Sequence, residues 1–435
     1  MDRVFSLENQ LRQMVRFEWA LSAALESAGL AGPGGTAAIE SFLDGLFIDE
    51  PALFAQARKY GNIAIPLIRQ LAASVRTRDE RAASTIHLGA TSQDVLDTAL
   101  VLQMREALEL IESSLKEVDE QLAIQAREHA DSVLAGRTWL QAGPPVTLGL
   151  KIAGWLAAIR RHRQRLESAR ERALTLQFGG AVGTLSALGE KGEHVSSVLA
   201  QKLELREPEI PWHAHRDNLV EVATSLGLLV GTLGKIARDV SLLMQTEVAE
   251  LSEPYEEGRG GSSTMPHKRN PVACAMILAA ATRVPALVST LLSAMNHEHE
   301  RGLGNWQAEW EVYPEIFGLT ASALERTLEI ARGMVVDRGK MRANLAANGG
   351  LGMAEAVSVA LAAQIGNDRS HDLVEQASRR AIASNLHLAA VLKSDAEIRR
   401  HLTEVQIDNL MDPENYLGTS KKMIARVLGD ADAVR

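Results

Sequence analysis

The chain of 435 residues contains a single cysteine, Cys274. One thiol cannot build a disulfide framework or a cysteine-rich metal site, so we expect a protein of a reducing compartment and interpret it as cytoplasmic. No group of histidine and glutamate residues has the spacing of metal ligands, and no glycine-rich nucleotide fingerprint follows a strand pattern. The sequence therefore predicts no metal and no nucleotide cofactor.

Aromatic residues are scarce, at 4% of the chain, whereas 46% of the residues are hydrophobic. This composition predicts a large aliphatic core and excludes a disordered chain. The chain also lacks an excess of basic residues, since its net charge is −9, and this argues against a nucleic-acid partner. The longest uncharged apolar run, residues 271–282, is too short to span a bilayer, and the polar N-terminus does not resemble a signal peptide. We therefore expect no membrane partner.

Proline is absent from four long stretches, residues 67–143, 146–207, 212–253 and 315–412. Because proline interrupts helix interiors, these stretches can form very long helices. Apolar residues recur there at steps of three and four, which predicts helices over about 94–130 and 147–176 and an apolar stripe along a third helix. The stripe consists of Leu219, Val222, Leu226, Leu229, Leu233, Ile236, Val240 and Leu243. Alternating runs of β-branched residues are missing, so we expect few or no strands.

These patterns predict an all-α fold with three helical domains. A small helical domain covers 1–95, a central long-helix bundle covers 96–338, and a second small helical domain covers 339–435, with a loop at 348–352. The long apolar stripes favour burial against other subunits. The alternative is a monomeric coiled coil, but Gly227, Gly231 and Gly234 indicate closer helix contacts within a denser bundle.

The most unusual segment is residues 258–271, GRGGSSTMPHKRNP. Its glycines leave backbone N–H groups available to an anion, and Ser262 and Ser263 add hydroxyl groups. Lys268 and Asn270 supply a positive charge and an amide donor, and Pro271 can begin the next helix. A solvated turn before a helix has the same composition, so composition alone leaves both interpretations open.

The string GSSTMPHKRNP resembles the signature loop of the fumarase/aspartase superfamily, which includes adenylosuccinate and argininosuccinate lyases. Residues 87–94 (HLGATSQD) and 136–141 (GRTWLQ) resemble the two other regions that build the composite active site of this superfamily. Within the superfamily the chain is most similar, nearly end to end, to the bacterial 3-carboxy-cis,cis-muconate cycloisomerases. The resemblance implies a homotetramer with a twenty-helix core, in which each active site takes residues from three subunits.

The resemblance also implies roles for individual residues in binding a small polycarboxylate substrate. Ser262 would move a proton to or from carbon, and Lys268 and Asn270 would stabilise the charged intermediate. The positions implied to contact substrate are His87, Thr91, Ser92, Thr138, Trp139, Gln141, Ser263 and Arg301.

Some of these residues have simpler interpretations. Thr91 and Ser92 before Asp94 are typical of a helix N-cap, and Arg301 could form a surface ion pair with a neighbouring glutamate. A lone histidine such as His87 is more often structural.

Trp139 stands where most of the superfamily has a histidine that helps the leaving group depart. An amine or hydroxide needs a proton to leave, whereas a carboxylate, with a conjugate-acid pKa of about 4, does not. The resemblance to the cycloisomerases, which also have tryptophan there, therefore implies an enzyme that closes 3-carboxy-cis,cis-muconate to a lactone by intramolecular carboxylate addition.

Two segments depart from the cycloisomerase pattern. Residues 142–145 (AGPP) stand where His-Ala-Thr-Pro is usual, and residues 215–218 (HRDN) stand where Gln-Arg-Asp-Arg is usual. The substrate therefore stays open: alternatives are a sulfomuconate cycloisomerase, an adenylosuccinate or argininosuccinate lyase, and a non-catalytic helical scaffold. Trp139 argues against the two lyases, and the intact signature loop argues against the scaffold.

Overall fold

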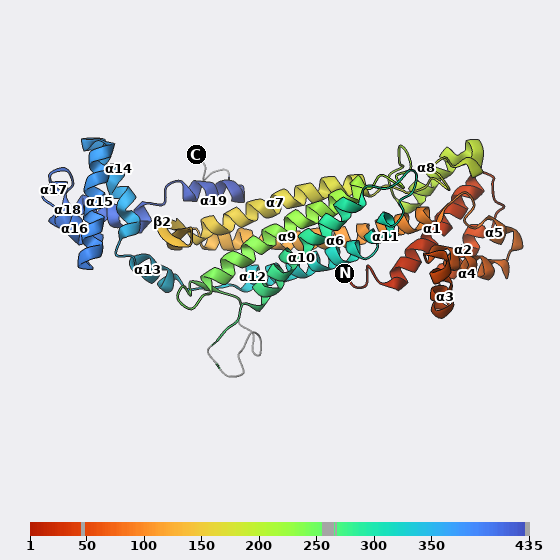
Figure 1. The fold of residues 1–435 in the computed structure, drawn as a ribbon, viewed down its shortest axis with the longest axis horizontal. Coiled ribbons are helices and arrows are strands. Elements are labelled where there is room, and N and C mark those ends of the chain that lie inside the picture. The colour runs from red at the N-terminus through yellow and green to blue at the C-terminus, as the bar shows by residue number, and fades with distance from the viewer. Residues whose placement is uncertain (45–47, 255–264, 266–267, 431–435) are drawn as a thin grey trace. The chain divides into compact units, whose positions relative to one another are not determined.

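The computed structural model describes residues 1–44, 48–254, 265 and 268–430 (Figure 1). These residues form two compact units. Unit 1 comprises residues 1–114, 162–231 and 280–323, and unit 2 comprises residues 115–161, 232–279 and 324–435. The long helices pass from one unit into the other. The division into three domains stays a prediction.

The described residues are mostly helical, as the sequence predicts. The N-terminal helices are α1 (Leu7–Ser27), α2 (Gly35–Asp44), α3 (Glu50–Tyr60), α4 (Ala64–Arg76) and α5 (Glu80–Thr85). The long helices are α6 (Ser92–Glu128), α7 (Leu148–Ala173), α9 (Asp217–Leu243), α10 (Val272–Ala294) and α12 (Val312–Gly333). Between them lie the 3-10 helix η1 (Ser186–Lys191) and the helices α8 (Gly192–Leu203) and α11 (Asn305–Glu309).

The C-terminal part contains seven further α-helices and two short 3-10 helices. These are α13 (Arg338–Ala346), η2 (Leu351–Met353), α14 (Ala354–Ile365), α15 (Asn367–Ser384), α16 (Leu388–Ser394), α17 (Ile398–His401), α18 (Glu404–Met411), η3 (Pro413–Asn415) and α19 (Ser420–Leu428). The described strands are few and form two antiparallel pairs, β1 (Val133–Thr138) with β2 (Gln141–Thr147) and β3 (Leu251–Ser252) with β4 (Val335–Val336).

The predicted long helices are confirmed to within a few residues. Helix α6 covers Ser92–Glu128 against the predicted 94–130, and α7 covers Leu148–Ala173 against the predicted 147–176. All eight residues of the apolar stripe lie on α9 and are buried. Burying each such side chain stabilises the fold by about 1.5–3 kcal/mol relative to its exposed state, so the stripe fixes which face of α9 points into the core.

Within unit 1, segments of the long helices pack side by side. A Cβ atom on Gly227 of α9 would lie 3.1 Å from Val288 Cγ2 of α10, so glycine permits close contact between these helices. Gly231 is exposed and nothing in the single chain lies within 4 Å of a Cβ placed there, so close packing at that position stays a prediction. Arg163 of α7 pairs with Glu112 of α6 at 2.7 Å, across neighbouring helices.

Within unit 2, helices α14, α15, α16 and α18 surround their own hydrophobic core. Its most deeply buried members are Val357, Leu361, Ala377, Leu388, Leu392, Ile398 and Ile407. The same unit contains the β1–β2 hairpin, which packs on α13 and on η2. The hairpin is therefore supported by a core separate from that of unit 1.

Two helices, α9 and α10, are long and apolar enough to cross a membrane by length and composition. This differs from the expectation based on the uncharged run alone, because α10 continues past Arg283 as an apolar helix. In α9, 61% of the most apolar window is buried, but in α10 only 33% is buried. Helix α10 thus presents a large apolar face that the single chain does not cover.

Candidate active site

The N-terminus of α6 is organised around the buried carboxylate of Asp94, which is 0% exposed. Its Oδ2 atom accepts hydrogen bonds from the backbone N–H groups of Thr91 and Gly180, both at 2.9 Å. Its Oδ1 atom accepts from the N–H of Gly179 at 3.1 Å and lies 2.6 Å from His213 Nε2. Of the two hydrogen bonds in the predicted capping box, the one from the Thr91 N–H to the Asp94 carboxylate is therefore present. Asp94 also holds residues 179–180 beside Thr91.

Arg301 contacts Thr91 instead of forming the surface ion pair that composition suggested. Its Nη1 donates to Thr91 Oγ1 at 3.1 Å, and its Nη2 donates to the carbonyl of Ala181 at 3.0 Å. Because Thr91 Oγ1 accepts this bond, its own hydroxyl proton is free to donate to another group. A guanidinium, two hydroxyls from Thr91 and Ser92, and the positive end of the α6 dipole therefore meet at one place, which suits a carboxylate.

His87 adds a second basic side chain to this part of unit 1. Its Nδ1 lies 2.7 Å from Oε1 of Glu18, which is 2% exposed. Burial alone would lower the pKa of His87, but the charge of Glu18 and the hydrogen bond to it outweigh burial and raise the pKa above its ordinary value. The pairing with Glu18 therefore favours the charged form of His87 and binds one of its ring nitrogens.

A buried ion cluster lies next along α6, beyond Asp94. Arg216 is 1% exposed, and its guanidinium bridges Asp97 on α6, at 2.7 and 3.0 Å, and Glu309 on α11, at 2.6–3.2 Å. The guanidinium also stacks over the ring of Trp212, 4.9 Å from its centroid. Asp97 lies about one helical turn beyond Asp94. The cluster therefore ties α6 to α11, which follows the segment that carries Arg301.

In unit 2, the predicted residues of the second family region lie at the tip of the β1–β2 hairpin. Thr138 pairs with Gln141, and the two-residue turn between them is Trp139–Leu140. Both turn residues have positive φ angles, +53° and +64°, as a type I′ turn requires. Asparagine and glycine are the usual residues there, so tryptophan and leucine make this a strained turn. The Trp139 side chain is 97% exposed at the tip.

A bidentate ion pair anchors the hairpin one residue before Thr138. Arg137 donates to Glu250 with Nη1–Oε2 at 2.9 Å and Nη2–Oε1 at 2.6 Å, and Glu250 is 0% exposed. Asn344 of α13 also donates to Glu250 Oε1 at 2.9 Å. A bulge lies at this point of β1, where a Cβ on Gly136 would lie 2.6 Å from the Pro144 carbonyl oxygen. The ion pair and the glycine together fix the direction of the hairpin tip.

The described end of the signature loop leads directly into α10, as Pro271 predicted. Lys268 is exposed and Asn270 is half-buried, both just before Val272 begins the helix. The carboxylate of Glu253 accepts hydrogen bonds from the N–H groups of Ala273 at 3.1 Å and Cys274 at 2.7 Å. Glu253, which is 7% exposed, therefore caps α10 and connects the residues preceding the loop to those following it.

The predicted site residues thus fall into two groups. Unit 1 holds His87, Thr91, Ser92 and Arg301, and unit 2 holds Thr138, Trp139, Gln141, Lys268 and Asn270. Ser262 and Ser263 lie outside the described residues. His215, one of the departures from the cycloisomerase pattern, is exposed, whereas its neighbour Arg216 is the buried centre of the ion cluster. Within the described chain, no three His, Cys, Asp or Glu side chains are grouped to hold a metal ion.

Sequence reasoning missed the residues that position these groups. They are Glu18, Asp97, His213, Arg216, Glu250, Glu253, Glu309 and Asn344. Most bind a partner more than sixty positions away in the chain, so no local spacing marks them. The one local signal is the WHAHRDN segment, in which two histidines, an arginine and an aspartate follow Trp212.

Comparisons with known proteins identify the family of the chain. The sequence profile of the lyase family matches residues 58–286, and that of the adenylosuccinate lyase C-terminus matches residues 350–427. The chain is 51% identical to the 3-carboxy-cis,cis-muconate cycloisomerase of Pseudomonas aeruginosa, covering 100% of this chain and 95% of that protein. It is 45% identical to the enzyme of the same name from Acinetobacter baylyi, covering 98% and 95%.

A solved structure has the same fold. The crystal structure of the 3-carboxy-cis,cis-muconate lactonizing enzyme from Pseudomonas putida matches with a TM-score of 0.94 at 49% identity, covering 100% of this chain and 97% of that one. The match extends through the long helices, the hairpin and the C-terminal helices. The chain therefore belongs to the fumarase/aspartase superfamily of lyases, within the group of the 3-carboxy-cis,cis-muconate cycloisomerases.

Proposed function

We propose that the protein closes 3-carboxy-cis,cis-muconate to a carboxymuconolactone. A carboxylate oxygen of the substrate attacks an alkene carbon of the same molecule and forms the ring C–O bond. The π electrons move to the neighbouring carbon and onto its carboxyl group, giving an enediolate-like intermediate. One proton delivered to that carbon completes the isomerisation, so no atom is gained or lost and no cofactor is needed.

The intermediate carries about two negative charges on one carboxyl group, so it needs donors that are already in place. We assign Lys268, Asn270, Thr91 and Thr138 to that group. The remaining carboxylates bind Arg301 and the other substrate-binding residues, namely Ser92, Gln141, Ser263 and the His87 imidazolium. This assignment is supported by the Arg301–Thr91 contact and by the Glu18 partner, which raises the pKa of His87.

Proton transfer to carbon is assigned to Ser262. A serine hydroxyl is a weak acid and its alkoxide is a strong base, so the N–H groups of a glycine-rich loop and the charge of Lys268 are needed to lower its pKa. Alanine at position 262 should lower kcat by orders of magnitude with little change in KM. Near-normal turnover of Ser262→Ala would show that another group supplies the proton.

The observation that carries the proposal is the residue at the hairpin tip. Trp139 cannot donate a proton to a leaving group through an acid side chain, and a carboxylate leaving group does not require one. The hairpin therefore suits a reaction that makes or breaks a bond to a carboxylate oxygen. The adenylosuccinate and argininosuccinate lyase reactions release an amine and therefore fit this tip less well. A sulfomuconate is the second candidate substrate, because residues 142–145 depart from the cycloisomerase pattern.

The experiment is a direct assay with four substrates. The purified protein is mixed with 3-carboxy-cis,cis-muconate, and loss of the diene absorbance reports ring closure. Sulfomuconate is tested in the same way, and fumarate release is measured with adenylosuccinate and argininosuccinate. Fumarate release without diene loss would replace the proposal with a lyase, and no turnover of any substrate would favour the scaffold.

We further propose a cytoplasmic homotetramer whose active sites are shared between subunits, with the three-domain division of each chain given above. The support is the uncovered apolar face of α10, where Met276 and Leu292 are 55% and 52% exposed. Partner helices would cover this face and account for its hydropathy without a membrane. Light scattering should give four times the 47.1 kDa protomer mass, and a monomer would contradict the shared sites.

A further inference from the structure

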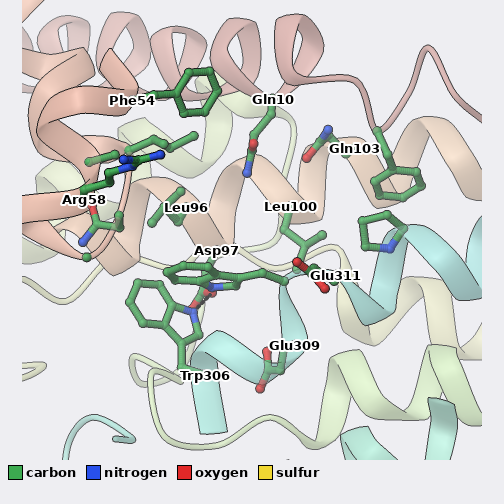
Figure 2. A pocket seen from close by; sticks show the side chains of 17 residues that line it. Gln10, Phe54, Arg58, Leu96, Asp97, Leu100, Gln103, Trp306, Glu309 and Glu311 are labelled. Atoms are coloured by element: carbon green, nitrogen blue, oxygen red, sulfur yellow. Dashed lines mark hydrogen bonds between the residues drawn. The ribbon is translucent and has the colours of Figure 1, made fainter. Parts of the chain in front are cut away.

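Unit 1 contains a cavity of about 630 Å³ that the proposed reaction does not use (Figure 2). It is enclosed by the start of the chain with α1, by α3 and the turn that follows it, by α6, and by α11 with the start of α12. No residue assigned above to substrate binding or proton transfer lines it. Its volume is within the range of small-molecule sites, about 300–1,000 Å³.

The walls are aromatic in a chain that has few aromatic residues. Trp306 and Trp310 meet edge to face with ring centroids 5.2 Å apart, and Phe54 faces the cavity from α3 (Figure 2). Phe54 and Trp310 are 46% and 38% exposed, so large apolar rings border the cavity without being covered. Rings arranged in this way favour a flat aromatic guest by edge and face contacts.

The polar groups of the cavity differ in whether they are already bound. Asp97 and Glu309 share the single guanidinium of Arg216, which offsets one of their two negative charges, and Gln103 donates to the Val4 carbonyl at 2.7 Å. By contrast, the exposed guanidinium of Arg58 forms no ion pair among the described residues. Arg58 therefore offers a planar, two-pronged donor beside aromatic walls, the arrangement that binds a carboxylate.

A third acidic group, which Arg216 does not contact, borders the cavity. Glu311 is exposed, and it lies across the cavity from Arg58 (Figure 2). Its charge repels an anion from that end, so a carboxylate is directed to Arg58 while the ring of the ligand lies toward the tryptophans. The lining thus distinguishes the two ends of a ligand.

We propose that this cavity is a second ligand site that takes an aromatic monocarboxylate, with its ring against Trp306, Trp310 and Phe54 and its carboxylate on Arg58. The site is separate from the lactonising site, and its occupancy does not depend on the proposed reaction. A ligand there would contact α6 and α11 next to the Arg216 cluster.

The test is a calorimetric titration of the full-length protein with 2-naphthoate. The neutral analogue 2-naphthamide has the same ring but no charge, so it should bind roughly tenfold more weakly or worse, the effect of losing a charged hydrogen bond. Arg58→Gln should weaken the binding of 2-naphthoate by a similar factor. The matched control is Arg69→Gln, because Arg69 is also exposed and stacks over Tyr60 at 4.8 Å but does not line the cavity.

Three results would overturn the proposal. One is the absence of a saturable titration with 2-naphthoate, and another is equal binding of 2-naphthoate and 2-naphthamide by the wild-type chain. The third is loss of binding in the active-site variant Lys268→Met with retention in Arg58→Gln, which would place the ligand in the lactonising site. Binding that is retained in Lys268→Met and Arg69→Gln and reduced in Arg58→Gln and Trp310→Ala supports it.

Discussion

Replacing Glu250 by glutamine should loosen the hairpin that carries Thr138 and Trp139. The substitution keeps the shape of the side chain and removes its charge. One carboxylate oxygen that now accepts from Arg137 becomes an NH₂ group, which cannot accept a hydrogen bond. The guanidinium of Arg137 then keeps at most one of its two bonds to residue 250.

The size of the effect follows from burial. Breaking a buried ion pair by removing one partner costs about 3–5 kcal/mol, because the remaining charge is uncompensated. The side chain of Arg137 is 25% exposed, so water partly solvates it, whereas that of Glu250 is 0% exposed. We therefore expect Glu250→Gln to lower the free energy of unfolding by about 2–3 kcal/mol, because one charged hydrogen bond and the ion pair are lost. Movement of the tip by about 1 Å would lower kcat by up to a hundredfold.

The matched control is Glu117→Gln in the same unit. Glu117 pairs with Arg332, but these side chains are 44% and 54% exposed. Exposed pairs contribute about 0–1 kcal/mol, so this variant should match the wild type in thermal unfolding and in turnover. Both variants are compared by thermal melting, and by kcat and KM for 3-carboxymuconate.

A double-mutant cycle separates positioning from general destabilisation. In Arg137→Gln with Glu250→Gln neither charge remains unpaired, so the double variant should melt above Glu250→Gln alone. If Glu250→Gln melts and turns over like Glu117→Gln, the argument that this ion pair directs the hairpin is wrong. If Glu250→Gln has normal turnover but a lowered melting temperature, the Arg137–Glu250 pair stabilises the fold without positioning the hairpin for catalysis.

Three further predictions concern the other parts of the site. The raised pKa of His87 means that stability from its pairing with Glu18 is fully present below pH 6.5, the unfolded value, and is lost as the pH rises through the raised pKa. The curve of melting temperature against pH should therefore become flatter over this pH range in His87→Gln, whereas His215→Gln should keep the wild-type curve. A wild-type curve for His87→Gln would refute the pairing. Asp94→Asn should destabilise by about 3 kcal/mol, because one amide end faces two N–H donors, and unchanged melting would contradict the geometry. Trp139→His should not raise the rate of lactonisation, and a large gain would mean that a proton on the departing oxygen matters.

The helices were predictable because their signals are local and repeated. The α9 stripe recurs through eight apolar positions, and the absence of proline allowed α6 to extend from Ser92 to Glu128. The β1–β2 hairpin was not predicted, because its turn consists of Trp139 and Leu140 instead of asparagine and glycine. Two prolines in β2 also argue against a strand, but among the described strands β2 pairs with β1 alone, and the unpaired edge tolerates them.

The candidate site was predictable only where resemblance pointed to individual residues. Thr91 and Arg301 are 210 positions apart, and only the folded chain brings them within 3.1 Å. The positioning carboxylates Glu18 and Glu250 have no sequence pattern around them that indicates their partners. Their chemistry depends on burial, which becomes known only when the helices are assembled.

The hairpin tip has a consequence for how this catalyst could acquire new substrates. Trp139 and Leu140 are 97% and 75% exposed, so neither side chain packs into the core of its own chain. Asparagine, aspartate or glycine at these positions would even relieve backbone strain. Under the proposed mechanism, variation confined to two adjacent codons therefore changes the side chains presented to the leaving group at little cost to the folding of the chain, while Arg137 and Glu250 hold the supporting strands.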